Sequence, residues 1–195
     1  MEKLTPKSNQ KPTEMLQDLD LAHHIHPFTD QKDLKSKKPL IIVRGEGVYI
    51  FDSDGKKYLD GMAGLWCVNI GYGRPELALA AKKQMEELPF YNTFFQTSHP
   101  PAIELASKLA SLAPNSLNHV FFSTSGSDAN ETNIRLVRHY WASIGKPEKS
   151  IIVSRKNAYH GSSIGAASLG GMESMHSQGG LPIPDIIHRG QHYGY

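Results

Sequence analysis

Three small residues, Ser125, Gly126 and Ser127, stand where this sequence could hold an anion. They follow the apolar run 119–122 and precede a segment with helical apolar spacing up to Trp141. This pattern predicts a turn between a buried strand and a helix. N–H groups at a helix N-terminus have no intrahelical acceptor, and the helix dipole adds partial positive charge there, so a phosphate is favoured. Gly126 would let the backbone come close, and the two serines would offer hydroxyl donors.

A helix cap accounts for the same residues. Serine and aspartate are favoured N-caps in their own right, and Asp128 with Glu131 would make a start that resembles a capping box. The turn alone therefore leaves both interpretations open.

A second polar turn, residues 159–162, follows the apolar run 151–153. In open α/β sheets, ligands bind outside the carboxyl ends of the strands, so the two turns are expected at one edge. Taken singly, Tyr159 indicates a half-buried aromatic and His160 an interior histidine. Taken with the first turn, a phosphate at Ser125-Gly126-Ser127 and a flat ring against Tyr159 would suit a phosphorylated aromatic cofactor.

Composition narrows the class of protein. The 195 residues suffice for one ordinary domain and are marginal for two, and 39% hydrophobic with 21% charged residues is a globular balance. A net charge of +2 with interspersed signs argues against nucleic-acid binding. One cysteine, Cys67, excludes an internal disulfide and fits a reducing compartment. No apolar run would span a bilayer and the polar N-terminus lacks a secretory signal, so we expect no membrane partner and a cytoplasmic location.

The elements around the two turns are predicted from local patterns. Residues 1–22 are expected to form a mobile tail. Short β-prone runs at 41–43, 48–51 and 57–59, separated by turn signals, predict an antiparallel meander. Amphipathic spacing predicts helices over 75–88, 102–112 and 126–141. Strands at 119–122 and 151–153 around the last helix would form a crossover in a parallel or mixed sheet covered by helices.

Three histidines, His23, His24 and His26, raise the question of a metal. Pro27 interrupts any helix, and no second group of histidine, cysteine or carboxylate ligands lies at a familiar spacing. We therefore expect no metal site.

Three separated motifs together resemble a known family. They are Phe-Phe-Ser-Thr-Ser-Gly-Ser-Asp-Ala-Asn at 121–130, Tyr-His-Gly-Ser at 159–162 and Asp-Gly-Met-Ala-Gly-Leu-Trp-Cys at 60–67. Their order is that of the class III aminotransferases that use pyridoxal 5′-phosphate, in particular the ω-amino acid and amine:pyruvate branch. The resemblance extends from about 26 to 184. It implies the α/β fold of the aspartate aminotransferase-like, fold-type-I enzymes, with residues 23–72 in the small domain and 73–195 as the first part of the large cofactor-binding domain.

The resemblance also implies roles for individual residues. Asp128 stands where many relatives carry glutamate, and both carboxylates can cap a helix. The implied cofactor residues are Ser125, Gly126 and Ser127 at the phosphate, Tyr159 at the ring face and His160 beside it. The implied substrate residues are Leu65 and Trp66 in the pocket, Phe28 near it, and Tyr91 and Phe94 reaching the neighbouring subunit's site in a homodimer.

The implied activity is transfer of an amino group from an ω-amino acid, diamine or amine to pyruvate. The family's Schiff-base lysine and its aspartate at the pyridine nitrogen lie in the part that follows Tyr195. Lys149 and Lys156 stand in contexts unlike the family's catalytic segment. The chain is therefore expected to be an N-terminal fragment without turnover of its own. Three alternatives stay open: another pyridoxal-phosphate enzyme of this fold, such as an aminomutase, a non-catalytic module that binds a phosphate anion, and a purely structural α/β domain. The last would explain each turn as capping, but not the joint occurrence of the Trp66, Ser127 and Tyr159 motifs.

Overall fold

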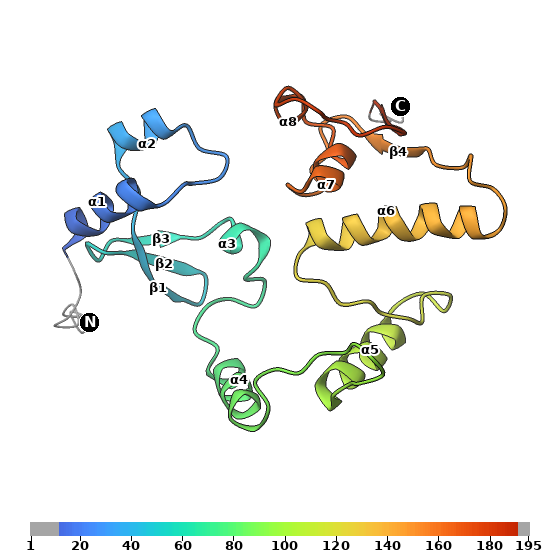
Figure 1. Cartoon of the computed structure of the whole chain (residues 1–195). Coiled ribbons are helices and arrows are strands. Elements are labelled where there is room, and N and C mark those ends of the chain that lie inside the picture. Colours follow the sequence, from blue (N-terminus) through green and yellow to red (C-terminus); the bar gives the residue numbers. More distant parts are fainter. Residues whose placement is uncertain (1–11, 191–195) are drawn as a thin grey trace, which may run out of the picture. The chain divides into compact units, whose positions relative to one another are not determined.

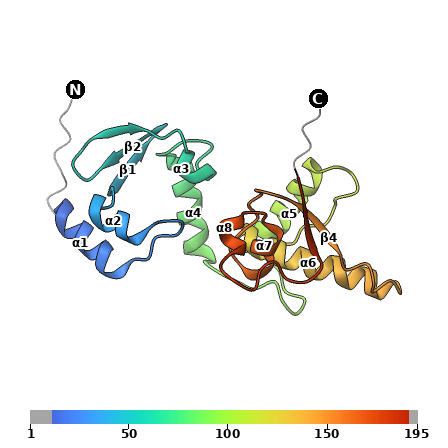
Figure 2. The same cartoon turned by 90° about the horizontal axis from the view of Figure 1, so that it is seen from above.

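The computed structural model describes residues 12–190, and the chain divides into two compact units, Met1–Asn92 and Thr93–Tyr195 (Figures 1 and 2). The boundary between them follows Asn92, whereas the sequence places a domain boundary between residues 72 and 73. The assignment of 23–72 and 73–195 to a small and a large domain concerns the complete fold and stays a prediction.

The first unit is built on a three-stranded meander. Strands β1 (Ile42–Glu46), β2 (Tyr49–Asp52) and β3 (Lys57–Leu59) pair antiparallel in the order β1-β2-β3, which confirms the predicted meander. Buried Asp52 fixes the turn between β2 and β3, because its carboxylate accepts the N–H groups of Asp54 and Lys56, at 3.0 and 2.8 Å, and the hydroxyl of Tyr58 at 2.7 Å. The other elements of this unit are α1 (Thr13–His23), α2 (Gln31–Lys37), α3 (Ala63–Trp66) and α4 (Pro75–Glu87).

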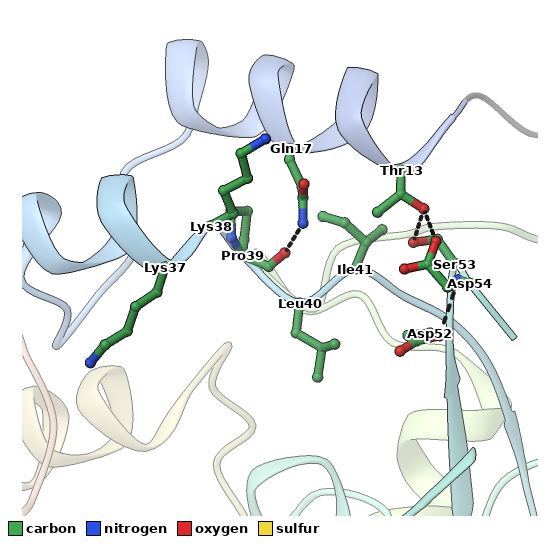
Figure 3. Close-up of a pocket in the computed structure, with 10 residues that line it drawn as sticks. All are labelled: Thr13, Gln17, Lys37, Lys38, Pro39, Leu40, Ile41, Asp52, Ser53 and Asp54. Carbon is green, nitrogen blue, oxygen red and sulfur yellow. Dashed lines mark hydrogen bonds between the residues drawn. The ribbon is translucent and has the colours of Figure 1, made fainter. Parts of the chain in front are cut away.

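Helix α1 corrects the prediction of a mobile tail for its residues 13–22; residues 1–11 of that tail lie outside the described part. The Thr13 hydroxyl donates to Asp54 at 2.5 Å, and the Gln17 amide donates to the Pro39 carbonyl at 2.9 Å. These contacts lie beside a shallow pocket of about 270 Å³ between α1 and the meander (Figure 3). The polar composition of this segment predicted a tail. The segment is ordered because Thr13 and Gln17, four residues apart on one helix face, make hydrogen bonds to residues distant in sequence. None of the residues proposed for the site lines this pocket.

The second unit contains α5 (Pro100–Leu112), α6 (Gly126–Ser143), β4 (Ile152–Arg155), α7 (Ile164–Leu169), α8 (Glu173–His176) and β5 (Ile186–Arg189). Strands β4 and β5 pair in parallel, from Ile152 with Ile186 to Arg155 with Arg189. The connection between them carries α7 and α8, and α7 packs against α6, β4 and α8. Small residues of α7 allow this close packing, and the buried apolar side chains of the unit are Ile134, Ala166, Ala167, Met175 and Ile186.

The predicted helices are confirmed, with α4 and α5 both beginning at prolines, which suit the first helical turn. The strand predicted at 119–122 is wrong: the segment is not a strand, and Phe121 is 71% exposed. A strand needs a neighbour for its backbone groups, and among residues 12–190 none pairs with this segment. The strand at 151–153 forms as β4 but is not buried, since Val153 is 61% exposed. The predicted crossover is therefore replaced by the one from β4 to β5.

No helix within residues 12–190 combines the length and the apolar character that crossing a membrane requires.

Candidate functional site

The first turn of α6 is capped from its own sequence. Ser125 is the N-cap, and its hydroxyl oxygen accepts the Asp128 N–H at 3.1 Å. Asp128 reaches back and accepts the N–H and the hydroxyl of Thr124, at 3.1 and 3.3 Å. The capping pair is thus Ser125 with Asp128, and the predicted pair of Asp128 with Glu131 is wrong. Capping fixes where the helix begins. The N–H groups of Gly126 and Ser127, which lie between the cap and Asp128, still have no intrahelical acceptors.

The start of α6 fits a phosphate group. Apart from the adjacent residues and the helix's own backbone, no heavy atom of the described residues lies within 4 Å of the position that a Cβ on Gly126 would take, so the backbone is open to approach there. The helix has 18 residues, long enough for its dipole to favour an anion at this end. The Asp128 carboxylate is already hydrogen-bonded to Thr124. Cap and anion cradle are therefore compatible, because they use different groups of the same turn.

One face of α6 holds the second predicted turn in place. Ser127, Asn130 and Glu131 lie at spacings of three and four residues, which puts them on one side of a helix. Their partners lie in the segment 160–166: the Ser127 hydroxyl oxygen accepts the Ser162 N–H at 3.1 Å, and Asn130 Nδ2 donates to the His160 carbonyl at 2.7 Å. The structure thus brings together the two polar turns.

Glu131 completes this contact from the same helix face. Its Oε1 accepts the N–H groups of Gly165 and Ala166, at 2.7 and 3.3 Å, at the beginning of α7. The Ser163 hydroxyl, followed by these two N–H groups, lowers the pKa of the Glu131 carboxyl against the opposing effect of burial. The carboxylate therefore stays charged and anchors α7 to α6.

Gly161 makes the approach of the two turns possible. Its φ is +127°, which L residues with side chains rarely adopt, and a Cβ there would clash with the Ser127 hydroxyl and the Ala166 methyl. Beside it, the Tyr159 hydroxyl lies 3.1 Å from Ser162 Oγ, and the Tyr159 side chain is 54% exposed. His160 is exposed, and its carbonyl fixes the backbone. All five residues proposed for the cofactor lie on these two turns, in the second unit.

The remaining candidates are exposed apolar side chains. Leu65 and Trp66 are 60% and 75% exposed on a turn in which Ala63, Gly64, Leu65 and Trp66 all have positive φ, from 46° to 65°. A left-handed conformation costs about 1–2 kcal/mol for each L residue, so this turn needs support from its surroundings. Phe28, Leu65, Trp66 and Tyr91 belong to the first unit, and Phe94, 6.0 Å from Phe95 between ring centres, belongs to the second.

Sequence reasoning missed the residues that position the site. Asn130 and Glu131 had a detectable signal, since they follow Ser127 by three and four residues on a predicted helix. Their partners, the N–H and C=O groups of 160–166, carry no side-chain signal at all.

Sequence reasoning also missed Asp20, which lies four residues before His24. Asp20 contacts His24 Nδ1 at 2.8 Å and His26 Nε2 at 2.6 Å, and the three ligand atoms lie within 4.8 Å of one another. The hydrogen bonds from His24 and then His26 lower the pKa of Asp20. Each carboxylate oxygen already pairs with an imidazole, so the group ties the end of α1 to the segment that follows.

The chain matches known proteins over most of its length. The family model described as aminotransferase class-III matches residues 32–192. A putrescine–pyruvate aminotransferase of Pseudomonas aeruginosa is 58% identical over 179 residues, which cover 92% of this chain and 39% of that protein. An (S)-enantioselective omega-transaminase from Thermomicrobium roseum superposes with a TM-score of 0.89 at 47% identity, over 93% of this chain and 41% of that one.

An omega transaminase from Pseudomonas jessenii, solved in complex with PMP, superposes with a TM-score of 0.88 at 41% identity. This match covers 90% of the present chain and 39% of the other. The chain thus spans about two fifths of the length of each of these three relatives.

Proposed function

Because the chain belongs to the class-III aminotransferases, we propose that the protein transfers an amino group from an ω-amino acid, a diamine or an amine to pyruvate, with pyridoxal 5′-phosphate as cofactor. The observation that carries this proposal is the 58% identity to a putrescine–pyruvate aminotransferase, which is well above the 42% identity to a gamma aminobutyrate transaminase of Solanum lycopersicum. The relative solved with PMP supports the choice of cofactor.

In this proposal the start of α6 binds the cofactor phosphate. The N–H groups of Gly126 and Ser127 point to it, and the Ser125 and Ser127 hydroxyls lie beside them. The Ser127 oxygen accepts the Ser162 N–H, which uses a lone pair and not the hydroxyl proton, so this side chain can hold the second turn and still donate to a phosphate oxygen. When bound, pyridoxal phosphate supplies the carbonyl carbon that receives the amino group and a conjugated ring that withdraws electrons.

The second turn orients the ring in the same proposal. The Tyr159 side chain, held through its hydroxyl at Ser162, would lie against one face of the ring, and His160 would lie next to it on a backbone fixed by Asn130. Flat apolar contact excludes water from that face. The hydrogen bonds from Ser127 and Asn130 to the second turn would keep the ring and phosphate contacts at a constant separation.

Exposed apolar side chains would select the amino donor. Leu65 and Trp66 form one wall of the pocket and Phe28 lies near it, while Tyr91 and Phe94 of one subunit reach the site of the other in a homodimer. Their exposure in the chain, 50% or more for each, suits side chains that a substrate or a second subunit covers.

The test is formation of alanine. The purified full-length enzyme with cofactor is given pyruvate together with putrescine, an ω-amino acid or an aromatic amine, and alanine is measured. We expect alanine only when both amine and pyruvate are present. Isomerisation of an amino acid without consumption of pyruvate would contradict the proposal and favour an aminomutase.

We further propose that the 195 residues by themselves form no covalent bond with the cofactor and do not turn over. The resemblance places the Schiff-base lysine after Tyr195, and the Lys149 ammonium is engaged elsewhere, 4.1 Å from the centre of the Trp141 ring. Borohydride treatment with cofactor, followed by mass spectrometry, should leave the mass of this chain unchanged. A stable adduct of cofactor mass on Lys149 or Lys156 would refute this.

We also propose a cytoplasmic location. The thiol of Cys67 is free and exposed, and such a thiol persists where conditions are reducing, as they are in the cytoplasm.

A further inference from the structure

The segment 60–72, which joins β3 to the residues before α4, is tied to the meander at both ends. The Asp60 N–H donates to the Val48 carbonyl at 3.0 Å. At the other end Tyr72 and Gly47 exchange two backbone hydrogen bonds, of 3.1 and 2.8 Å. Both anchors lie on the turn between β1 and β2. The segment therefore leaves one tight hairpin turn and returns to it, which makes it a loop held at both ends.

The middle of this loop is the left-handed turn Ala63–Trp66. Trp66 N–H donates to the Met62 carbonyl at 2.8 Å, and Cys67 N–H donates to the Ala63 carbonyl at 2.9 Å. Three of its four residues have side chains, and such residues keep positive φ only where the surroundings impose it. The turn presents Leu65 and Trp66 as large exposed apolar side chains.

One carboxylate supplies the support. Asp60 Oδ2 accepts the Gly64 N–H at 2.8 Å, within the turn, and the Tyr72 hydroxyl at 2.7 Å. Asp60 Oδ1 accepts the Met62 N–H at 3.2 Å, directly before the turn. The Tyr72 hydrogen bond, followed by that of Gly64, lowers the pKa of Asp60, so the acceptor is charged at neutral pH.

Tyr72 is itself fixed by packing. Its ring lies against the backbone of Gly45 in β1, where a Cβ would clash with the ring. The hydrogen bond to Asp60 raises the pKa of the Tyr72 hydroxyl, which therefore stays a donor over the physiological range. The chain of contacts runs from β1 through Tyr72 and Asp60 to the turn.

We propose that Asp60 and Tyr72 are a positioning pair, which holds the left-handed turn so that Leu65 and Trp66 present a fixed apolar wall to the amino donor. The proposal rests on the proposed function for the identity of that wall's ligand. Neither residue touches the donor. Their hydrogen bonds influence which amino donors fit against the wall, because the Trp66 indole could change its position if the turn were loose.

The chain offers a matched control in Asp52 and Tyr58. This second pair has the same 2.7 Å hydrogen bond, and Asp52 also accepts two backbone N–H groups. It supports the turn between β2 and β3, outside the segment 60–72. Tyr58→Phe therefore removes the same chemistry from the same unit without touching the Trp66 turn.

The experiment compares Tyr72→Phe and Asp60→Asn with Tyr58→Phe. Amide hydrogen exchange of Gly64 is measured by NMR in the 195-residue chain, and Trp66 emission is measured with Trp141→Phe as background. Loss of a hydrogen bond to a charged group should accelerate Gly64 exchange about tenfold or more in the first two variants and shift the Trp66 emission, with Tyr58→Phe unchanged. Unchanged Gly64 exchange in Tyr72→Phe, or an equal change in Tyr58→Phe, would overturn the proposal.

Donor choice is the second readout, measured on the active enzyme as the ratio of kcat/KM for putrescine and for a bulky aromatic amine. The ratio should change severalfold in Tyr72→Phe while cofactor affinity stays the same. A looser turn with an unchanged ratio would overturn the role in donor choice. Failure of the unmodified enzyme to form alanine would instead refute the proposed function, so the two failures are distinguishable.

Discussion

Replacement of Gly126 by alanine separates the two roles of the α6 N-terminus. Within the described part of the chain, a Cβ at this position meets no heavy atom within 4 Å apart from the adjacent residues and the helix's own backbone. The residue is also helical, so the methyl group fits the protein. Alanine is favoured over glycine in a helix by about 0.5–1 kcal/mol. If the turn were a cap and nothing else, Gly126→Ala would be a stabilising substitution without further effect.

The phosphate role predicts a second and opposite effect. The methyl group would occupy space through which a phosphate oxygen reaches the N–H groups of the first turn. Loss of one hydrogen bond to a charged group costs about 1.5–3 kcal/mol, which weakens binding about 10- to 100-fold. We therefore expect a variant that is more stable than the unmodified protein and binds pyridoxal phosphate more weakly.

Urea unfolding gives the free energy of unfolding, and fluorescence titration gives the cofactor Kd. Titration with pyridoxal, which lacks the phosphate, should show no difference between Gly126→Ala and the unmodified protein. Gly190→Ala is the control for cofactor affinity, because no atom of the described residues, apart from its chain neighbours, lies within 4 Å of a Cβ there. Equal affinity for pyridoxal phosphate in Gly126→Ala and the unmodified protein would refute the phosphate role and leave only the cap.

Three further outcomes follow from named contacts. Glu131→Gln should lower the free energy of unfolding by about 1–2 kcal/mol in urea, because the charged acceptor of the Gly165 N–H is lost, whereas Glu148→Gln on the surface should change it little. An equal loss in both variants would contradict this. Trp66→Ala should alter the order of amine preference in an alanine-formation assay while cofactor affinity stays unchanged, and loss of cofactor would instead make Trp66 structural. The Tyr58 hydrogen bond lowers the pKa of Asp52 below its ordinary value of 3.8, so its stabilising contribution is present above that pH and is lost as the pH falls through the lower folded value. In acid unfolding followed by circular dichroism, the free energy of unfolding should therefore depend less steeply on pH in Asp52→Asn than in the unmodified protein. An identical pH dependence in the two proteins would exclude this contribution.

The elements that the sequence predicted correctly depend on neighbours in the chain. Helices α4, α5 and α6 follow from apolar spacing, and α4 and α5 begin at prolines. The meander follows from turn chemistry, as the buried Asp52 shows by accepting the backbone of its own turn. The three motifs that resemble aminotransferases are also contiguous stretches, which is why the family could be identified from the sequence.

The errors concern partners that lie far away in sequence. Residues 119–122 have the composition of a strand, but pairing needs another segment, and β4 pairs with β5 instead. The expected tail became α1 because Thr13 and Gln17 find acceptors about 40 and 22 residues away. Glu131 was expected in the cap of its own helix, yet it binds N–H groups 34 and 35 residues later.

The sequence by itself determined the serine N-cap of α6 and the meander, because each depends on a few adjacent residues. It also carries the residue types that a phosphate site would need. Only the tertiary structure decided that Ser127, Asn130 and Glu131 hold the second turn against the first. It also decided that Asp60 and Tyr72 support the Trp66 turn. Those contacts join side chains to backbone groups, which every residue carries, and so no pattern of residue types reveals which of them will meet.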